Sequence, residues 1–220
     1  MQSVIVIVAL WLAFAGSHMA LSAVPVRTRL VAALGEWPFR GVYSLVSFAT
    51  FIPLVWFYFQ HKHAGPLLWA VPLTPLVLGL LYFGNALAFI LIAGGYLSPS
   101  PAVMGMTTVR HRPIHDLTRH SLFMGVGLWG LMHMVPNGFA GDVAFFGGFV
   151  VFALVGSWHQ DARLVKTRGE AYRQFVRETP FIPFTGKYTL RGLKGFPLRA
   201  VFAGILVAAV IRYFHAAWFL

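Results

Sequence analysis

The chain has 220 residues, of which 58% are hydrophobic and only 10% are charged. Soluble domains carry roughly 25% charged residues, so this composition excludes an ordinary soluble protein and predicts an all-α, polytopic membrane helix bundle. A net charge of +11 can indicate nucleic acid. We exclude that partner, because the basic residues lie in short loops between apolar runs, where membrane proteins place them. With no cysteine in the chain, a metal or haem needs histidine, methionine or oxygen ligands.

Six apolar runs predict about six transmembrane helices, each of which needs about 20 residues to cross a bilayer. The predicted spans are residues 2–24, 40–60, 67–95, 120–136, 141–158 and 197–219. Arg27 and Arg29 follow the first run and no basic residue precedes it. A secretory signal has the opposite arrangement, so we expect this segment to stay in the mature protein as a spanning helix.

The basic residues are distributed unevenly over the loops. Of the 17 lysines and arginines, all but Lys62 and Arg212 lie in the loops that follow spans one, three and five or at the span ends that border these loops. The positive-inside rule therefore places these loops in the cytoplasm of a bacterial inner membrane and both termini in the periplasm. On the outer side, His61 and His63 are expected in solvent and His215 at the membrane interface.

Residues 159–183 have an amphipathic pattern. Apolar side chains share one helical face, which carries Val165, Tyr172, Phe175 and Val176, and the cations lie elsewhere. The pattern predicts a cytoplasmic interfacial helix in the headgroup layer, with its cations toward anionic lipid. A solvated linker whose charges only set the topology is the alternative.

Three histidines lie in or beside apolar spans, where a polar ring without a partner is costly. His18 is in the first span, His133 is inside the fourth, and His120 begins the fourth next to Arg119. Each ring could simply hydrogen-bond across a helix interface. Alternatively, two rings from different helices could ligate a haem, since helical bundles bind cofactors between facing helices. The depths along the helices leave open whether His18 would pair with His133 or with His120. Arg119 is expected to reach headgroups or to pair with Asp161 or Glu170.

The order of several motifs resembles the NnrU family of membrane proteins, which includes the zeta-carotene isomerases. The matching pieces are GSHMALS with VRTRLVAALGEWPFRGVYSLVSF, TRHSLFMGVGLWGLMHMVPNG, FFGGFVVFALVGSWHQDARL and RGEAYRQFVRETPFIPF. They cover most of residues 15–185. We therefore expect an NnrU-like membrane domain over residues 1–185, followed over residues 186–220 by a cytoplasmic loop and a C-terminal transmembrane helix.

In the isomerase branch, the resemblance implies a haem b and a redox-sensitive cis–trans isomerisation of a carotenoid double bond. It implies His18 and His133 as the haem-binding metal ligands and Arg119 and His120 as catalytic residues. In the NnrU branch proper, it implies a role in nitric oxide and denitrification metabolism. The implied partners are the lipid bilayer, an apolar or lipid-like substrate, and a membrane protein of nitrogen-oxide metabolism. The sequence departs from the family at Ser121, where the family has proline, and at His159, where it has an asparagine-like residue.

A second resemblance supports a rival function. Arg-His at a helix start, followed by Gly-Glu-x-Tyr-Arg and Phe-Ile-Pro, is similar to membrane methyltransferases of the isoprenylcysteine carboxyl type. That resemblance implies S-adenosylmethionine at the cytoplasmic face, bound by Arg119, His120, Glu170, Tyr172 and Arg173. A third alternative is a non-enzymatic membrane assembly factor for a metalloenzyme. An absorption spectrum of the purified protein separates these alternatives, because only a haem protein has a Soret band.

Overall fold

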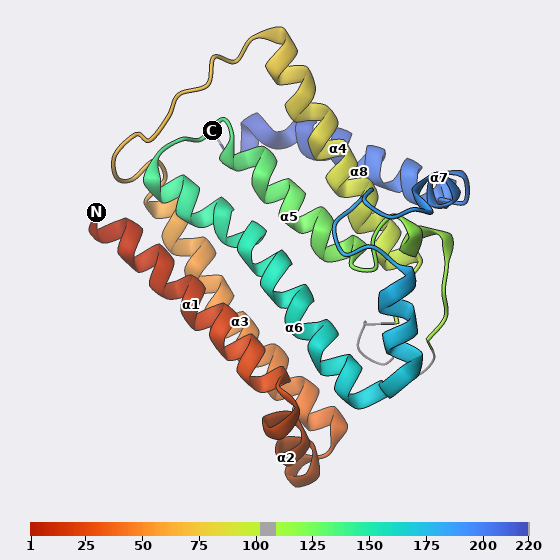
Figure 1. Ribbon diagram of the computed structural model, residues 1–220. Helices are drawn as coiled ribbons and strands as arrows, with labels where there is room; N and C mark the ends of the chain where they lie inside the picture. The colour runs from red at the N-terminus through yellow and green to blue at the C-terminus, as the bar shows by residue number, and fades with distance from the viewer. Residues whose placement is uncertain (102–108, 220) are drawn as a thin grey trace. The chain divides into compact units, whose positions relative to one another are not determined.

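The structure is a computed structural model that describes residues 1–101 and 109–219. Within these residues it is helical, apart from one isolated bridge between Leu67 and Phe139. Five of the described helices are long and apolar enough to cross a membrane, and they are α1, α3, α4, α6 and α8 in Figure 1. A sixth apolar helix, α5 (Ser121–Met134), has 14 residues. The all-α membrane architecture is confirmed.

One compact unit contains residues 1–71 and 133–152. Its helices are α1 (Gln2–Ser22), α2 (Val24–Leu34), α3 (Glu36–Gln60) and the first part of α6 (Ala140–Glu178). The chain leaves α2 at Gly35, whose φ of 87° lies in the left-handed region that favours glycine. This turn lets α3 begin at Glu36, four residues before the predicted second span, and α3 then lies beside α1 (Figure 1).

Aromatic rings fill the core of this first unit. Trp11 of α1 packs edge-on against Phe149 of α6, with ring centroids 4.9 Å apart, and donates its indole N–H to the carbonyl of Phe145 at 3.1 Å. Phe14 lies 5.0 Å from both Phe51 of α3 and Phe152 of α6. The rings therefore hold three helices together, and the one polar atom of Trp11 is satisfied.

The other compact unit contains residues 72–132 and 153–220. Its elements are α4 (Pro75–Leu97), the 3-10 helix η1 (Pro113–Asp116), most of α5, the rest of α6, α7 (Thr189–Lys194) and α8 (Leu198–Phe219). α4 packs very closely on its neighbours: a Cβ added at Gly125 of α5 would lie 2.7 Å from the Ala88 carbonyl oxygen. Such small residues let backbones approach where lipid gives no hydrophobic driving force.

The predicted third span, residues 67–95, begins too early. The helix starts at Pro75, where the Thr74 side chain accepts the Val77 N–H at 3.3 Å as an N-cap. The preceding segment is extended, because its backbone bonds to another loop: Leu68 donates to the Gly138 carbonyl at 2.8 Å. Prolines at 72 and 75 also lack the N–H that an earlier helix start needs.

The amphipathic region after the fifth predicted span is the continuation of α6. The helix changes direction at Gly169, whose φ of 62° and ψ of −140° suit only glycine. The apolar face predicted there is buried inside the protein, where Leu164, Tyr172 and Phe175 form a small core. Partly buried valines at positions 109, 165 and 176 pack against it.

Candidate functional site

A buried carboxylate, Asp161 of α6, organises the polar interior of the second unit. It accepts hydrogen bonds from the Arg119 Nε and from the Tyr172 hydroxyl, each at 2.8 Å. It also pairs with the His120 Nε2 at 2.9 Å. The side chains of Arg119 and His120 are only 9% and 1% exposed. We call these four residues the Asp161 cluster. The expected pairing of Arg119 with Asp161 is confirmed, and it neutralises charges that would be costly to bury alone.

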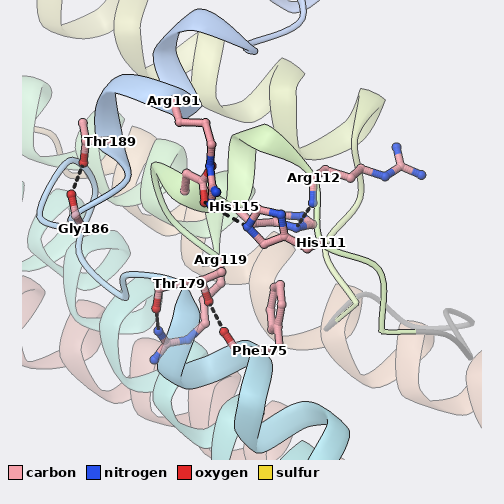
Figure 2. A network of polar contacts seen from close by, with 10 residues as sticks. His111, Arg112, His115, Arg119, Phe175, Thr179, Gly186, Thr189 and Arg191 are labelled. Atoms are coloured by element: carbon pink, nitrogen blue, oxygen red, sulfur yellow. Dashed lines mark hydrogen bonds and ion pairs between the residues drawn. The ribbon is translucent and has the colours of Figure 1, made fainter.

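Arg119 also fastens the segment that follows α6. Its Nη1 donates to the Thr179 carbonyl at 2.6 Å (Figure 2). Its backbone N–H donates to the Pro180 carbonyl at 3.1 Å. The guanidinium carbon lies 5.2 Å from the centre of the Phe181 ring, a cation–π distance. Arg119 therefore holds the segment after α6 through backbone as well as side-chain contacts.

A second buried carboxylate, Asp116, lies in η1. Arg191 of α7 donates two hydrogen bonds to it, from Nε at 2.7 Å and from Nη2 at 2.8 Å. The His111 Nε2 lies 2.9 Å from the Asp116 Oδ1. Burial acts to raise the pKa of Asp116, but the Arg191 hydrogen bonds and the His111 charge outweigh it and hold that pKa below its ordinary value. The carboxylate thus joins η1 to α7, as Figure 2 shows for Arg191 and His111.

His115, beside Asp116, has an unusual environment that sequence reasoning missed. Its side chain is 1% exposed, and its Nδ1 accepts the Arg112 backbone N–H at 3.1 Å. Its Nε2 is buried and has no hydrogen-bond partner among the described residues. Burial, helped by the nearby His111 and Arg112, lowers the pKa of His115 to about 3, so the ring is neutral. A loop histidine carries no periodic signal that could have revealed this.

A pocket connects His115 with the Asp161 cluster. Its polar lining comes from His115, Arg119, His120, Ser98, Ser100, Ser121 and Gln160. Leu122, Phe123 and Gly95 supply an apolar wall at the start of α5 and the end of α4. The structure therefore brings the predicted catalytic residues Arg119 and His120 together at one pocket, next to a histidine that the sequence did not single out.

The predicted haem ligands lie in the first unit. The His18 ring packs among Phe14, Tyr43 and Phe152 at 4.7–5.6 Å, and the His133 ring stacks on Phe146 at 5.2 Å. These contacts on α6 are six residues apart, or about 9 Å along the helix axis, whereas two nitrogens on one metal lie about 4 Å apart. The rings thus lie at different levels of α6, and the haem pairing stays a prediction. In the described part of the chain, no group of three or more His, Asp or Glu side chains could hold a metal.

The five residues of the methyltransferase resemblance do not meet at one site. Arg119, His120 and Tyr172 belong to the Asp161 cluster, but Glu170 is exposed and pairs with Arg177 at 2.6 Å. Arg173 is half exposed and lies 3.5 Å from Glu170. The alternative with S-adenosylmethionine stays a prediction without a shared site.

One outer-side histidine differs from expectation. The side chain of His63 is about half exposed, but its Nδ1 pairs with the fully buried Asp142 at 2.7 Å, and Tyr58 donates to the same carboxylate at 3.0 Å. Asp142 also accepts the His63 backbone N–H at 3.1 Å. His63 is therefore bound to Asp142 at the start of α6 and is not simply solvated. No sequence pattern indicates a partner 79 residues away.

Comparison with known proteins decides the family. The family model described as "NnrU protein" matches residues 6–220. The chain belongs to the NnrU family. This NnrU protein is also similar to "15-cis-zeta-carotene isomerase, chloroplastic" of Zea mays, with 26% identity over 159 residues that cover 69% of this chain and 42% of the relative. The Arabidopsis thaliana protein of the same description is 25% identical over the same coverage. The NnrU chain spans less than half the length of these relatives, and no solved structure matches it.

Proposed function

We propose that this NnrU protein isomerises a cis double bond of a long, apolar polyene within the bacterial inner membrane. The observation that carries the proposal is the similarity over 159 residues to two proteins described as 15-cis-zeta-carotene isomerases. The apolar helices support it, because a carotene is a hydrocarbon that partitions into the bilayer core, and a spanning bundle can meet it there.

A haem b, held by His18 and His133, is the proposed cofactor, and it would supply a redox-active iron. The hydrogen bonding of His18 fits this role. The Ser47 hydroxyl donates its single proton to the Tyr43 carbonyl at 2.8 Å, so it must accept from the His18 Nδ1, 3.3 Å away. The His18 Nε2 then carries the lone pair that a metal needs, and Ser47 orients the ring as the outer partner of a metal-bound histidine does. His133 also supplies an imidazole, and its ring stacks on that of Phe146.

The isomerase activity is tested in cells that accumulate 15-cis-zeta-carotene. Chromatography of the extracted carotenoids should show loss of the 15-cis isomer when the NnrU protein is expressed, and no loss with an empty vector. An unchanged isomer ratio, with the protein present in the membrane fraction, contradicts the proposal. Co-purification with a nitrogen-oxide reductase in that case would support the assembly-factor alternative.

The haem is tested separately by the absorption spectrum of the purified protein. A Soret band is expected, and His18→Ala and His133→Ala should each shift or remove it. His61→Ala and His215→Ala are matched controls that should leave it unchanged. His120→Ala separates the two ligand pairings, since it spares the band if His133 is the partner of His18. A full, unshifted Soret band in both His18→Ala and His133→Ala would show that neither histidine binds haem and that both only pack between helices.

A further inference from the structure

The starting observation is the tautomer of His115. Its Nδ1 accepts a backbone N–H from Arg112 at 3.1 Å, so that nitrogen holds no proton. In a neutral ring the proton then resides on Nε2, which becomes a hydrogen-bond donor. This N–H is buried without a partner among the described residues. Native proteins rarely leave a buried donor unpaired, because its desolvation is not repaid.

His115 is one of the residues that line the pocket at the start of α5, and among the described lining residues none is acidic. Asp161 lies behind this lining and is already paired with Arg119 and His120. Arg119 also lines the pocket, and although its charge is paired with Asp161, its described contacts use only Nε and Nη1, which leaves the Nη2 N–H groups to donate to a further oxygen. A protonated Nε2 and a guanidinium both repel a metal cation and both favour an oxygen that carries negative charge. The site is therefore suited to an anion.

The apolar side of the pocket indicates what the anion is attached to. Leu122 and Phe123 line it where the apolar helix α5 begins, and Gly95 lines it near the end of α4. A membrane amphiphile places its charged group at this level and its chain along such helices. A carotene cannot fill the site, because a hydrocarbon has no atom that accepts a hydrogen bond.

We propose that this pocket binds the carboxylate or phosphate end of an amphipathic molecule, with one of its oxygens accepting the His115 Nε2–H and facing Arg119. This ligand is distinct from the polyene of the proposed function. The inference therefore stands or fails independently of the isomerase activity.

The test uses the full chain in phosphatidylcholine nanodiscs with ¹⁵N-labelled histidine. The His115 Nε2–H resonance is assigned by its loss in His115→Leu. The probes are oleate and oleoyl lysophosphatidate, their uncharged counterpart oleyl alcohol, and the small anions acetate and inorganic phosphate. Oleate or the lysophosphatidate should shift the resonance saturably, and oleyl alcohol should bind at least tenfold more weakly.

The variants connect binding to the pocket. His115→Leu should weaken binding of the charged amphiphile by tenfold or more, and His115→Gln, which keeps an N–H donor, should restore most of the affinity. His61→Leu, in the other unit, should change it less than twofold. Equal affinity for acetate and oleate supports the site but identifies the ligand as a free anion. No shift with any probe, or undiminished binding by a folded His115→Leu, overturns the proposal and leaves an ordered water as the partner of Nε2.

Discussion

At the residue scale, hydrogen bonds to Nδ1 decide which ring nitrogen carries the proton in His18 and in His115, with opposite results. Ser47 makes the His18 Nδ1 a donor and so makes its Nε2 the acceptor nitrogen. The Arg112 backbone makes the His115 Nδ1 an acceptor and so makes its Nε2 a donor. The sequence predicted a role for His18 and gave none to His115. The difference cannot be read from spacing, because it depends on which backbone group the fold brings to each ring.

Arg119→Lys tests the bidentate role of that arginine. Lysine cannot reach the Asp161 carboxylate and the Thr179 carbonyl together, as the guanidinium does at 2.8 and 2.6 Å. The swap should lower the free energy of unfolding by about 2 kcal/mol and reduce function. Thermal melts in detergent measure it. Arg173→Lys, at an exposed ion pair, is the control and should change stability by less than about 0.5 kcal/mol. Equal melting temperatures for Arg119→Lys and Arg173→Lys would show that Arg119 only contributes a positive charge that sets the membrane topology.

His115 should also make the protein sensitive to acid. Its pKa is lowered to about 3 in the folded state, from about 6.5 unfolded, so the folded state binds fewer protons between these values. Above pH 6.5 the ring is neutral in both states and does not reduce the free energy of unfolding. As the pH falls toward 3, protons bind the unfolded chain first, and the free energy of unfolding falls by on the order of 4 kcal/mol. His111, Arg112, Asp116 and His120 face the ring; Asp116, whose pKa is also lowered, adds a loss only below about pH 4.

The measurement compares melting temperature against pH for the wild type and His115→Gln. Between pH 6.5 and 4 the variant should have a shallower decline, because glutamine does not titrate. His61→Gln should keep the wild-type slope. Parallel curves for the wild type and His115→Gln would show that another group controls the acid response.

At the element scale, the hydrophobic runs predicted the helices well and their ends poorly. Every predicted span contains a helix, because a backbone in lipid must satisfy its hydrogen bonds internally. The start of α4 was misplaced, since residues 66–69 pair with the 138–141 loop, a contact that composition does not encode. α2 was missed because its sequence, VPVRTRLVAAL, is short and carries two arginines. The pairing of Arg119 with Asp161 was predictable, because a buried cation needs a nearby acid.

The close packing of α4 and α5 gives a prediction at this scale. A side chain at Gly125 would meet the Ala88 carbonyl oxygen at 2.7 Å and the Ile92 nitrogen at 2.9 Å, and backbone cannot give way as a flexible side chain does. Gly125→Leu should therefore destabilise the protein by about 3 kcal/mol or more. Gly79→Leu on α4 is the matched control, because nothing lies within 4 Å of a Cβ there. Thermal melts should separate the two; equal stability would mean that α5 does not pack on α4 as described.

At the scale of the whole molecule, the question is whether α5 counts as a membrane crossing. Its 14 residues span only about 21 Å, less than the roughly 30 Å of a hydrocarbon core. Its start, however, lies beside Asp161, which follows the apolar part of α6. Its end leads into the 135–141 loop, where Gly141 donates to the Ala64 carbonyl at 2.8 Å, next to Lys62. The start of α5 is thus joined to the end of the apolar part of α6, and we predict that α5 is a sixth crossing.

Single-cysteine labelling tests this count, because the chain has no cysteine of its own. With six crossings, Lys62→Cys lies outside and Lys187→Cys lies in the cytoplasm, on the side that holds most of the basic residues. A membrane-impermeant maleimide should label Lys62→Cys in intact spheroplasts and Lys187→Cys only after permeabilisation. If α5 does not cross, the part of the chain after the apolar half of α6 moves outside with the nine lysines and arginines of residues 163–199, against the positive-inside rule. Labelling of both variants in intact spheroplasts would establish five crossings, which would put Asp161 on the opposite side of the membrane from Arg119 and His120 and contradict the contacts of the Asp161 cluster.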